Sequence, residues 1–420
     1  MKKRILIKAP ILTRSGYGEQ SRFALRSLRS REDIFDIYIQ PLTWGETSWI
    51  NDETEERQYI DKTIEKTIHY IQSGGSFDIS LQISIPNEWQ DIAATNIGYT
   101  AGIETTRVAH EWIQIGESMD KIIVVSNHSK NIYKNTIYEA VNNTTGEKTE
   151  IQLNTTDVTA VNYPVKTYEN LEPLELNLDY DFNFVCVAQM GPRKNLMNTI
   201  KWFVEEFHDD EVGLIVKTNL AKNCLMDREV VYAQLVTPLN GEFPDRKCKI
   251  YLLHGDMTDE EMHAMYLNPK VKASVSLTHG EGFGLPLFES AYMGVPVVAP
   301  GWSGQCAFLF DDEMSEKFYN VSFDIGTIPE QVVWEGVLIK ESGWCYPREE
   351  SAKAAMRQCY EDIQKDAPDT PASNSCIHAD FLKNKFSEEK MYAQFIDAMG
   401  VETEFDVEKW VESLDIEEIK

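Results

Sequence analysis

Three features are scarce or missing in this 420-residue sequence. No stretch approaches the roughly 18 consecutive apolar residues that a membrane-spanning helix needs. The seven cysteines are an odd number without a Cys-x-x-Cys pair, so neither a disulfide framework nor a zinc site is indicated. Positive charge is also scarce, because 40 lysines and arginines stand against 68 acidic residues and leave a formal net charge of −28. We therefore expect a reducing, cytoplasmic setting, and a total charge that disfavours nucleic acid and anionic membranes.

The negative charge is unevenly distributed along the chain. Residues 1–165 hold 17 basic and 22 acidic residues, a net charge of −5, whereas the remainder holds 23 and 46, a net charge of −23. The first 31 residues contain nine basic residues and a single acidic one, Glu19. Among them Arg22, Arg26 and Arg29 are spaced to share one helix face. This face is either a solvated surface or a site for an anionic ligand, with Arg22 and Arg26 as the candidate binding residues.

The length fits about two domains of roughly 150 to 200 residues with a cleft between them. Short apolar runs alternate with amphipathic stretches in both halves, which indicates parallel α/β sheets. The Pro- and Glu-rich residues 165–181 are typical of a linker, and residues 143–165 resemble a hairpin before it. We expect two α/β domains, at 1–165 and at 175–375. Residues 376–420 should form a helix returning to the first domain, plus an acidic tail.

The least ordinary stretch is HGEGFGLPLFESAYMGVPVVAP, residues 279–300. Pro286 suits the first turn of a helix, and Gly294 suits its end. The preceding residues then form a turn that leads from a strand into a helix N-terminus, where unpaired backbone N–H groups favour an anion. Gly282 and Gly284 are small enough to let a phosphate approach the main chain. The stretch therefore predicts a phosphate site at the start of this helix.

Two glutamates, Glu281 and Glu289, bracket that turn. Carboxylates beside a phosphate would repel it unless they face sugar hydroxyl groups on either side. A nucleotide sugar has this layout, with a diphosphate between a ribose and a hexose. The alternative is an ordinary strand-to-helix turn with two solvated glutamates.

The segments EGFGLPLFE and AYMGVPVVAP resemble the Glu-x7-Glu signature of retaining glycosyltransferases of family 4. Those enzymes have the GT-B fold, in which two Rossmann-like domains face a cleft. The resemblance covers the second half of the chain, through VCVAQMGPRKNLMNTIKWF and LLHGDMTDEEMHAMY. It implies an α/β fold of that type, with two Rossmann-like domains facing a cleft. Residues 1–165 would be the acceptor domain and residues 175–375 the nucleotide-sugar domain, and the reaction would transfer a sugar from a nucleotide donor.

The resemblance also implies roles for individual residues. Glu289 would hold the ribose, Glu281 would contact the donor sugar, and the basic pair Arg193 and Lys194 would neutralise the diphosphate. The rest of the donor-binding loop would be Gly282, Phe283, Gly284 and Leu285.

One departure leaves the diphosphate contacts open. The family usually has an arginine a few residues before the lysine, where this chain has Gln189. Arg193 or Lys217 is then the candidate replacement. For Lys217 alone, an ordinary charge at a strand end is an equal alternative.

In the first half, residues 16–18 follow the first strand and precede a helix, so Gly16 and Gly18 are candidates for close approach to the donor. A plain turn is the alternative. Many family members have a histidine after the fourth or fifth strand, but this chain reads NIGYTAGIETTRVAHEW there. Glu104 is then the nearest polar candidate, unless it only caps a helix start, because His110 lies too far along.

We expect a retaining hexosyltransferase that moves a hexose from a nucleotide diphosphate to an acceptor hydroxyl without an obligatory metal ion or other cofactor. Its acceptor would be a glycan, a lipid-linked glycan or another hydroxyl compound, and an anionic acceptor would be bound by Arg22 and Arg26. One alternative is a virus-encoded enzyme that glycosylates a hydroxymethylated DNA base, which the basic first helix favours. The other is a non-catalytic protein that binds sugar nucleotides or glycans.

Overall fold

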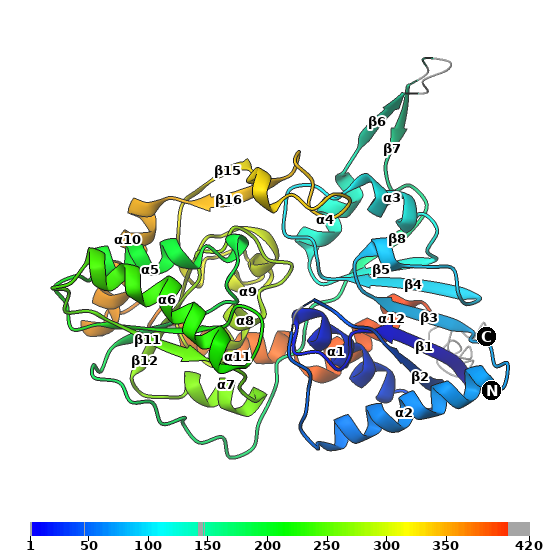
Figure 1. Ribbon diagram of the computed structural model, residues 1–420, viewed down its shortest axis with the longest axis horizontal. Helices are drawn as coiled ribbons and strands as arrows, with labels where there is room; N and C mark the ends of the chain where they lie inside the picture. The colour runs from blue at the N-terminus through cyan, green and yellow to red at the C-terminus, as the bar shows by residue number, and fades with distance from the viewer. Residues whose placement is uncertain (1, 46, 142–145, 147, 402–420) are drawn as a thin grey trace, which may run out of the picture.

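The structure is a computed structural model, which describes residues 2–45, 47–141, 146 and 148–401. Two six-stranded parallel sheets form its two halves (Figure 1). The first sheet has the order β2-β1-β3-β4-β5-β8 and the second has the order β11-β10-β9-β12-β13-β14. The first comprises β1 (Lys3–Ala9), β2 (Phe35–Pro41), β3 (Ile79–Ile83), β4 (Thr95–Thr100), β5 (Lys121–Val124) and β8 (Asp157–Ala160). The second comprises β9 (Asn183–Val187), β10 (Gly213–Thr218), β11 (Lys249–His254), β12 (Val271–Val275), β13 (Val297–Ala299) and β14 (Tyr319–Asn320).

The central strands are buried along nearly their whole length, as in β3 and β9. A parallel sheet is covered on both faces, so its strands are continuous apolar runs rather than alternating ones. Helices supply that cover. They are α1 (Gly16–Arg29), α2 (Glu55–Gln72), α3 (His110–Gly116), α4 (Asn127–Asn135), α5 (Leu196–Glu206), α6 (Leu225–Glu242), α7 (Asp259–Tyr266), α8 (Leu285–Tyr292), α9 (Cys306–Leu309), α10 (Glu349–Gln364), α11 (Ser375–Lys385) and α12 (Glu388–Met399).

Two antiparallel hairpins lie outside the sheets. One joins β6 (Tyr138–Val141) to β7 (Lys148–Ile151) and projects from the first half (Figure 1). The other pairs β15 (Phe323–Thr327) with β16 (Gly343–Pro347) on the side of the second half, and the segment between these strands extends toward α4 of the first half (Figure 1). The prediction of a hairpin at 143–165 is therefore wrong, because residues 157–160 form β8, which pairs in parallel with β5 as an edge strand of the first sheet.

Apolar packing continues from one half into the other. Phe283, after β12, lies 5.2 Å between ring centroids from Tyr163, which follows β8. Helix α11 packs against α8 of the second half, and α12 packs against α1 of the first (Figure 1). The chain therefore crosses back to the first half after the second sheet is complete. The acidic tail expected at the C-terminus lies outside the described residues, apart from its first residue, Val401.

Within the part of the chain that the structure describes, no helix combines the length and apolar character that crossing a membrane requires.

Candidate functional site

The site is built where β9 and β12 end side by side in the second sheet. After β9 the chain forms a short 3-10 helix, η2 (Pro192–Lys194), and after β12 it forms the glycine-rich turn. Two hydrogen bonds join these loops. The backbone N–H of His279 donates to the Arg193 carbonyl at 2.8 Å, and Arg193 Nη1 donates to the Gly280 carbonyl at 2.5 Å. Parallel strands place their carboxyl ends at one edge of a sheet, which is where ligands of such folds bind.

Four charged side chains meet at this edge. Arg193 lies 2.9 Å from Glu104 through Nε and 3.1 Å from Glu281 through Nη1. Lys194 Nζ lies 2.6 Å from the other oxygen of Glu281. Glu104 comes from the first half and the other three from the second, so the cluster joins the halves. All four are predicted catalytic residues, and the structure brings them together.

The carboxyl groups in this cluster have different pKa shifts. Burial alone would raise the pKa of Glu281, but Lys194 and Arg193 outweigh it and hold the pKa at about 2. Burial raises the pKa of Glu104 above its usual value, because Arg193 opposes the rise only in part and Glu281 adds to it. Burial lowers the pKa of Lys194, and the charge on Arg193 adds to that effect. Glu281 is therefore a fixed anion, whereas Glu104 is closer to accepting a proton.

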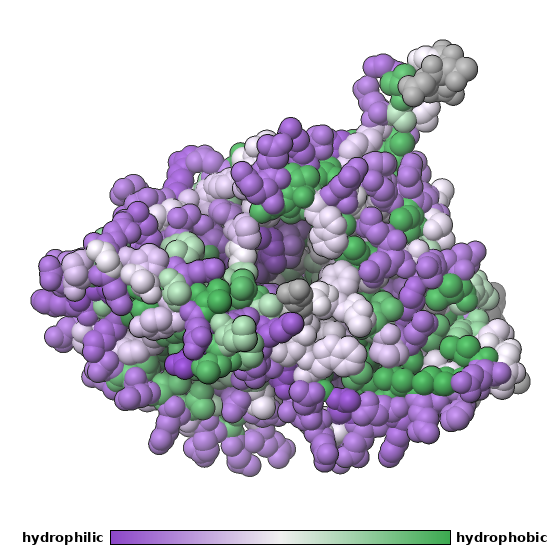
Figure 2. Space-filling model, in the orientation of Figure 1, coloured by the Kyte–Doolittle hydropathy of each residue, from purple (hydrophilic) through white to green (hydrophobic). Residues whose placement is uncertain are grey.

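The cluster borders a cavity of about 250 Å³. Figure 2 shows a hydrophilic recess between the two halves of the molecule. Glu104, Arg193 and Lys194 form the charged side of the cavity, and the β9 loop adds residues 189–192. Its apolar side comprises Val332, Leu338 and Trp344.

The glycine-rich turn packs against the first half. A Cβ on Gly282 would lie 2.1 Å from the Ala101 carbonyl oxygen, and one on Gly280 would lie 2.2 Å from that of Glu104. We expected Gly282 to leave room for a phosphate, but the main chain of the first half occupies that room. Gly284 has a φ of +98° and is the N-cap of α8, so the backbone conformation itself favours glycine there.

The other residues of the turn contribute mostly to the packing of the core and to the start of α8. Phe283 is 3% exposed and lies in the core that joins the halves. Leu285 is the first residue of α8, and Pro286 follows it in the first turn, as the sequence predicted. The helix ends before Gly294, which has a φ of +82°. Donor contacts by Phe283 and Leu285 stay predictions.

Glu289 lies one turn into α8, in a separate acidic environment. Burial, opposed by Lys166 and assisted by the charges on Asp259 and Glu19, raises its pKa to about 8. Lys166 is already paired, at 2.9 Å from Glu19 and 2.6 Å from Asp259. Among the described residues, no ion pair or hydrogen bond engages the Glu289 side chain. Its carboxyl group is thus available for a ligand.

The remaining donor-site candidates are dispersed. Lys217 ends β10 and donates to the Gly255 carbonyl, and burial lowers its pKa. Gln189, where the family has arginine, donates to the Leu220 carbonyl at 2.9 Å. Gly16 begins α1 with open space around its Cβ position, whereas a Cβ on Gly18 would lie 1.9 Å from the Thr13 carbonyl oxygen. The close contact with Thr13 therefore explains Gly18, whereas Gly16 leaves free space at the N-terminus of α1.

The arginines of α1 already have partners within the chain. Arg22 is 9% exposed and donates to the Ile11 and Thr13 carbonyls. Arg26 pairs with Glu19 at 3.1 Å and with Glu56 at 2.6 Å. Arg29 is the most exposed of the three, and it approaches Glu32 at 3.8 Å and the ring of Tyr59. The open basic face is thus largely absent, and acceptor binding by Arg22 and Arg26 stays an untested prediction.

Two further observations concern His110 and a possible metal motif. His110 begins α3, is half-exposed and lies 3.2 Å from Glu111, away from the charged cluster as expected. The chain does contain one Asp-x-Asp triplet, Asp179-Tyr180-Asp181. It precedes β9, at the strand end opposite the site, and Asp179 pairs with Lys249 at 2.7 Å. No group of three potential metal ligands occurs within residues 2–45, 47–141, 146 and 148–401.

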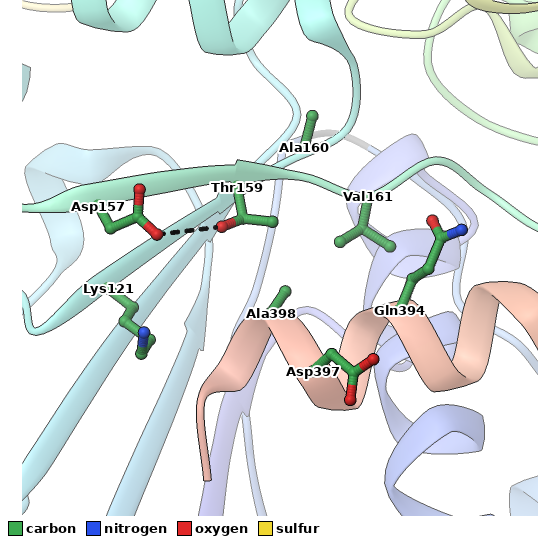
Figure 3. Close-up of a pocket in the computed structure, with 8 residues that line it drawn as sticks. All are labelled: Lys121, Asp157, Thr159, Ala160, Val161, Gln394, Asp397 and Ala398. Atoms are coloured by element: carbon green, nitrogen blue, oxygen red, sulfur yellow. Dashed lines mark hydrogen bonds between the residues drawn. The ribbon is translucent and has the colours of Figure 1, made fainter. Parts of the chain in front are cut away.

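A larger cavity of about 320 Å³ lies elsewhere, between the edge strand β8 and the end of α12 (Figure 3). Thr159 donates to Asp157 at 3.5 Å on its wall. None of the predicted site residues lines it, and its polar groups do not converge on one point. We therefore place the candidate site at the charged cluster, where paired ionic groups from both halves meet.

The sequence did not identify the apolar side of the site. Val332, Leu338 and Trp344 lie in the segment that includes the β15–β16 hairpin, far along the chain from Glu104 and Arg193. No spacing rule connects these positions, since only the pairing of β15 with β16 and its packing on the first half bring them here.

Comparison with protein-family models and with curated protein sequences gives no match. Comparison with solved structures does. The chain is similar to HepE of Anabaena, solved with UDP and glucose, with a TM-score of 0.59, 11% identity and coverage of 95% of this chain and 99% of that one. A glycosyltransferase from Rickettsia africae has a TM-score of 0.58 and 13% identity, with coverage of 95% of this chain and 98% of that one. Sucrose-phosphate synthase from Thermosynechococcus elongatus has a TM-score of 0.57 and 12% identity, with coverage of 94% of this chain and 98% of that one. At these identities the likeness establishes the fold, which is the GT-B fold of two facing Rossmann-like units.

Proposed function

We propose that the protein is a retaining hexosyltransferase that uses a nucleotide-diphosphate sugar and needs no metal ion. The observation that carries this proposal is the cluster of Glu281, Arg193, Lys194 and Glu104 at the edge where the strands of the second sheet end. UDP in the HepE structure, which has the same fold, supports a nucleotide as the first ligand to test.

The cluster suits a diphosphate because its cations are already assembled and partly desolvated. In the free protein Arg193 and Lys194 are neutralised by the two carboxylates. A bound diphosphate takes over the cations and leaves Glu281 free to accept hydrogen bonds from hexose hydroxyls. Charge on the leaving diphosphate grows in the transition state, so preorganised cations act most strongly there.

Glu289 is assigned to the ribose. It lies on the same short helix that follows the glycine-rich turn, and its carboxyl group has no partner among the described side chains. Two adjacent ribose hydroxyls are donors that a single carboxylate accepts well.

The reaction breaks the bond between C1 of the hexose and the diphosphate oxygen, and the diphosphate leaves with the electron pair. A bond forms between C1 and the acceptor oxygen, whose proton passes to a base. Glu104 borders the cavity, and its raised pKa brings it closer to the value that suits a base near neutral pH. The transition state is oxocarbenium-like, as in glycosidases.

The decisive test of nucleotide binding is calorimetric titration with UDP and ADP. We expect Glu289→Ala to weaken binding about 10-fold to 100-fold, because a charged acceptor contributes roughly 1.5–3 kcal/mol. Glu389→Ala is the matched control, since Glu389 is exposed in the first turn of α12. Equal affinity in the wild type and Glu289→Ala would remove the ribose assignment.

A DNA acceptor loses its main support in this structure, because the α1 arginines that favoured it are paired with carboxylates and backbone carbonyls. Hydroxymethylated DNA therefore serves as a comparison acceptor, and we expect no transfer to it.

A further inference from the structure

A strap of the second half covers the cavity beside Glu104. We use this name for residues 328–342, which connect β15 to β16. The strap is fastened to the first half at its tip, where Asn87 Nδ2 donates to the Gly336 carbonyl at 3.0 Å. At its base, Gly343 and Thr106 exchange two hydrogen bonds, of 2.7 and 3.1 Å. The strap thus brings Val332 and Leu338 to the cavity wall.

Trp344, which follows the strap in β16, also lines this cavity. Its side chain is 1% exposed, and its ring stacks on His279 with centroids 5.4 Å apart and planes 11° apart. The indole N–H is buried and has no hydrogen-bond partner among the described residues. A buried donor without a partner costs free energy, so such groups in a cavity wall are candidates for binding a ligand.

The charges around the cavity balance. Arg193 and Lys194 face Glu104 and Glu281, and each cation lies within 3.1 Å of at least one of these carboxylates. The opposite wall is apolar. A sugar ring fits such a space, because its C–H face packs on apolar side chains and its hydroxyls reach polar groups at the edge. The volume of about 250 Å³ is below the roughly 300–1,000 Å³ of pockets for drug-sized ligands, so it suits a single ring.

We propose that this cavity receives the acceptor, that the acceptor presents a neutral sugar ring, and that the Trp344 N–H donates a hydrogen bond to one of its hydroxyls. The inference rests on the proposed function. Glu104, the assigned base, lines the cavity beside Arg193 and Lys194, which are assigned to the diphosphate, so an acceptor here lies next to the leaving group, whereas Glu281 and Glu289 do not line the cavity. The strap and Trp344 therefore select the acceptor, and the charged cluster handles the donor.

A spectroscopic test follows the indole N–H directly. In ¹⁵N-labelled protein saturated with UDP, the Trp344 indole signal is the one missing from the spectrum of Trp344→Phe. We expect this signal to shift when glucose, galactose or mannose is added, with at least one of the three active. Glucose 6-phosphate is the anionic comparison.

The outcomes separate the two proposals. If UDP itself does not bind, the proposed function fails and the acceptor inference falls with it. If UDP binds and the indole signal ignores all three neutral sugars, or responds to glucose 6-phosphate alone, only the acceptor inference is overturned.

Kinetics then distinguish acceptor from donor. Trp344→Phe keeps an aromatic ring on His279 but removes the donor, so we expect the acceptor KM to rise about threefold to tenfold, the effect of one hydrogen bond. The donor KM should change much less than the acceptor KM. Trp334→Phe is the matched control, because Trp334 is 58% exposed on the same strap.

A rise in donor KM instead of acceptor KM in Trp344→Phe would place the indole at the transferred hexose and overturn the acceptor assignment. A second variant, Leu338→Ala, enlarges the apolar wall without touching the indole. We expect it to accept disaccharides better than the wild type, and an unchanged acceptor range would also contradict the inference.

Discussion

At the scale of single residues, the protonation of Glu289 links binding to pH. Burial raises its pKa to about 8, so the carboxyl group of the free protein is mostly protonated at pH 7. A ribose that donates two hydrogen bonds favours the carboxylate. Nucleotide binding at neutral pH must therefore release a proton from this site.

We predict that UDP affinity rises about tenfold between pH 7 and pH 9, because the ionised fraction of a group with a pKa near 8 rises by that factor. The Glu289→Gln variant should lose this slope. Titration calorimetry at several pH values measures both. The same slope in wild type and variant would show that another group controls it.

Glu281 has the opposite shift. Lys194 and Arg193 outweigh burial and hold its pKa at about 2, below the usual value of about 4.5. A lowered pKa stabilises the fold at pH values above about 4.5, and the contribution is lost as the pH falls toward 2. We predict that Glu281→Gln lowers the free energy of unfolding at pH 7 by about 2 kcal/mol, less than for a fully buried pair because the two cations are partly exposed.

Urea unfolding at pH 7 and pH 3.5 checks this prediction. The difference between the wild type and Glu281→Gln should shrink at the lower pH. An equal difference at both values would mean that the ion pairs with Glu281 contribute little.

At the scale of elements, the glycine-rich turn depends on close contact between the halves. Gly282→Ala places a Cβ 2.1 Å from the Ala101 carbonyl oxygen, a distance that forces backbone movement. We predict a drop in Tm of several degrees and a larger radius of gyration in X-ray scattering. Gly16→Ala is the matched control, because nothing lies within 4 Å of that Cβ position and its φ is not positive.

Gly16→Ala should keep the wild-type Tm or raise it slightly, since alanine restricts the unfolded chain. If both variants behaved alike, contact between the turn and the first half would not be what Gly282 provides.

Local patterns predicted some elements well and missed others for physical reasons. Pro286 and Gly294 bound α8 because turn and cap chemistry is contained in a few residues. Helix α6 was missed because its apolar residues form no clear stripe and Pro238 lies inside it. Strand β8 is four residues long, and its pairing with β5 depends on distant parts of the chain.

The site was predictable to a similar extent. Arg193, Lys194 and Glu281 follow from motifs at two strand ends, and Glu104 follows from its place after β4. The helical spacing of Arg26 is visible in the sequence, but its partner Glu56 belongs to α2, far along the chain. Trp344 reaches the cavity only through the packing of the whole β15–β16 segment.

At the scale of the whole molecule, ion pairs join the halves beside Glu289. Lys166 links Glu19 of α1 to Asp259 of α7. We predict that Lys166→Met lets the halves separate, because it removes the cation that links Glu19 to Asp259. The cations that stay beside Glu19 are Arg22 and Arg26, which lie on α1 with it. Its radius of gyration without nucleotide should exceed that of the wild type.

The control for that prediction is Lys365→Met. Lys365 is exposed and, within the described part of the chain, its one ion pair is with Glu361 of the adjoining α10, so its loss should leave the radius of gyration unchanged. Equal scattering curves for wild type and Lys166→Met would show that the apolar core alone holds the halves together.

The central claim is that the charged cluster transfers a hexose from a nucleotide donor. Proton NMR of the protein incubated with UDP-glucose or ADP-glucose, with and without a neutral sugar acceptor, tests it most directly. We predict that nucleoside diphosphate is released and that the new glycosidic bond shows the α anomeric proton signal, retained from the donor. A protein that binds the nucleotide but releases diphosphate from neither donor, or that yields a β-linked product, would contradict the account.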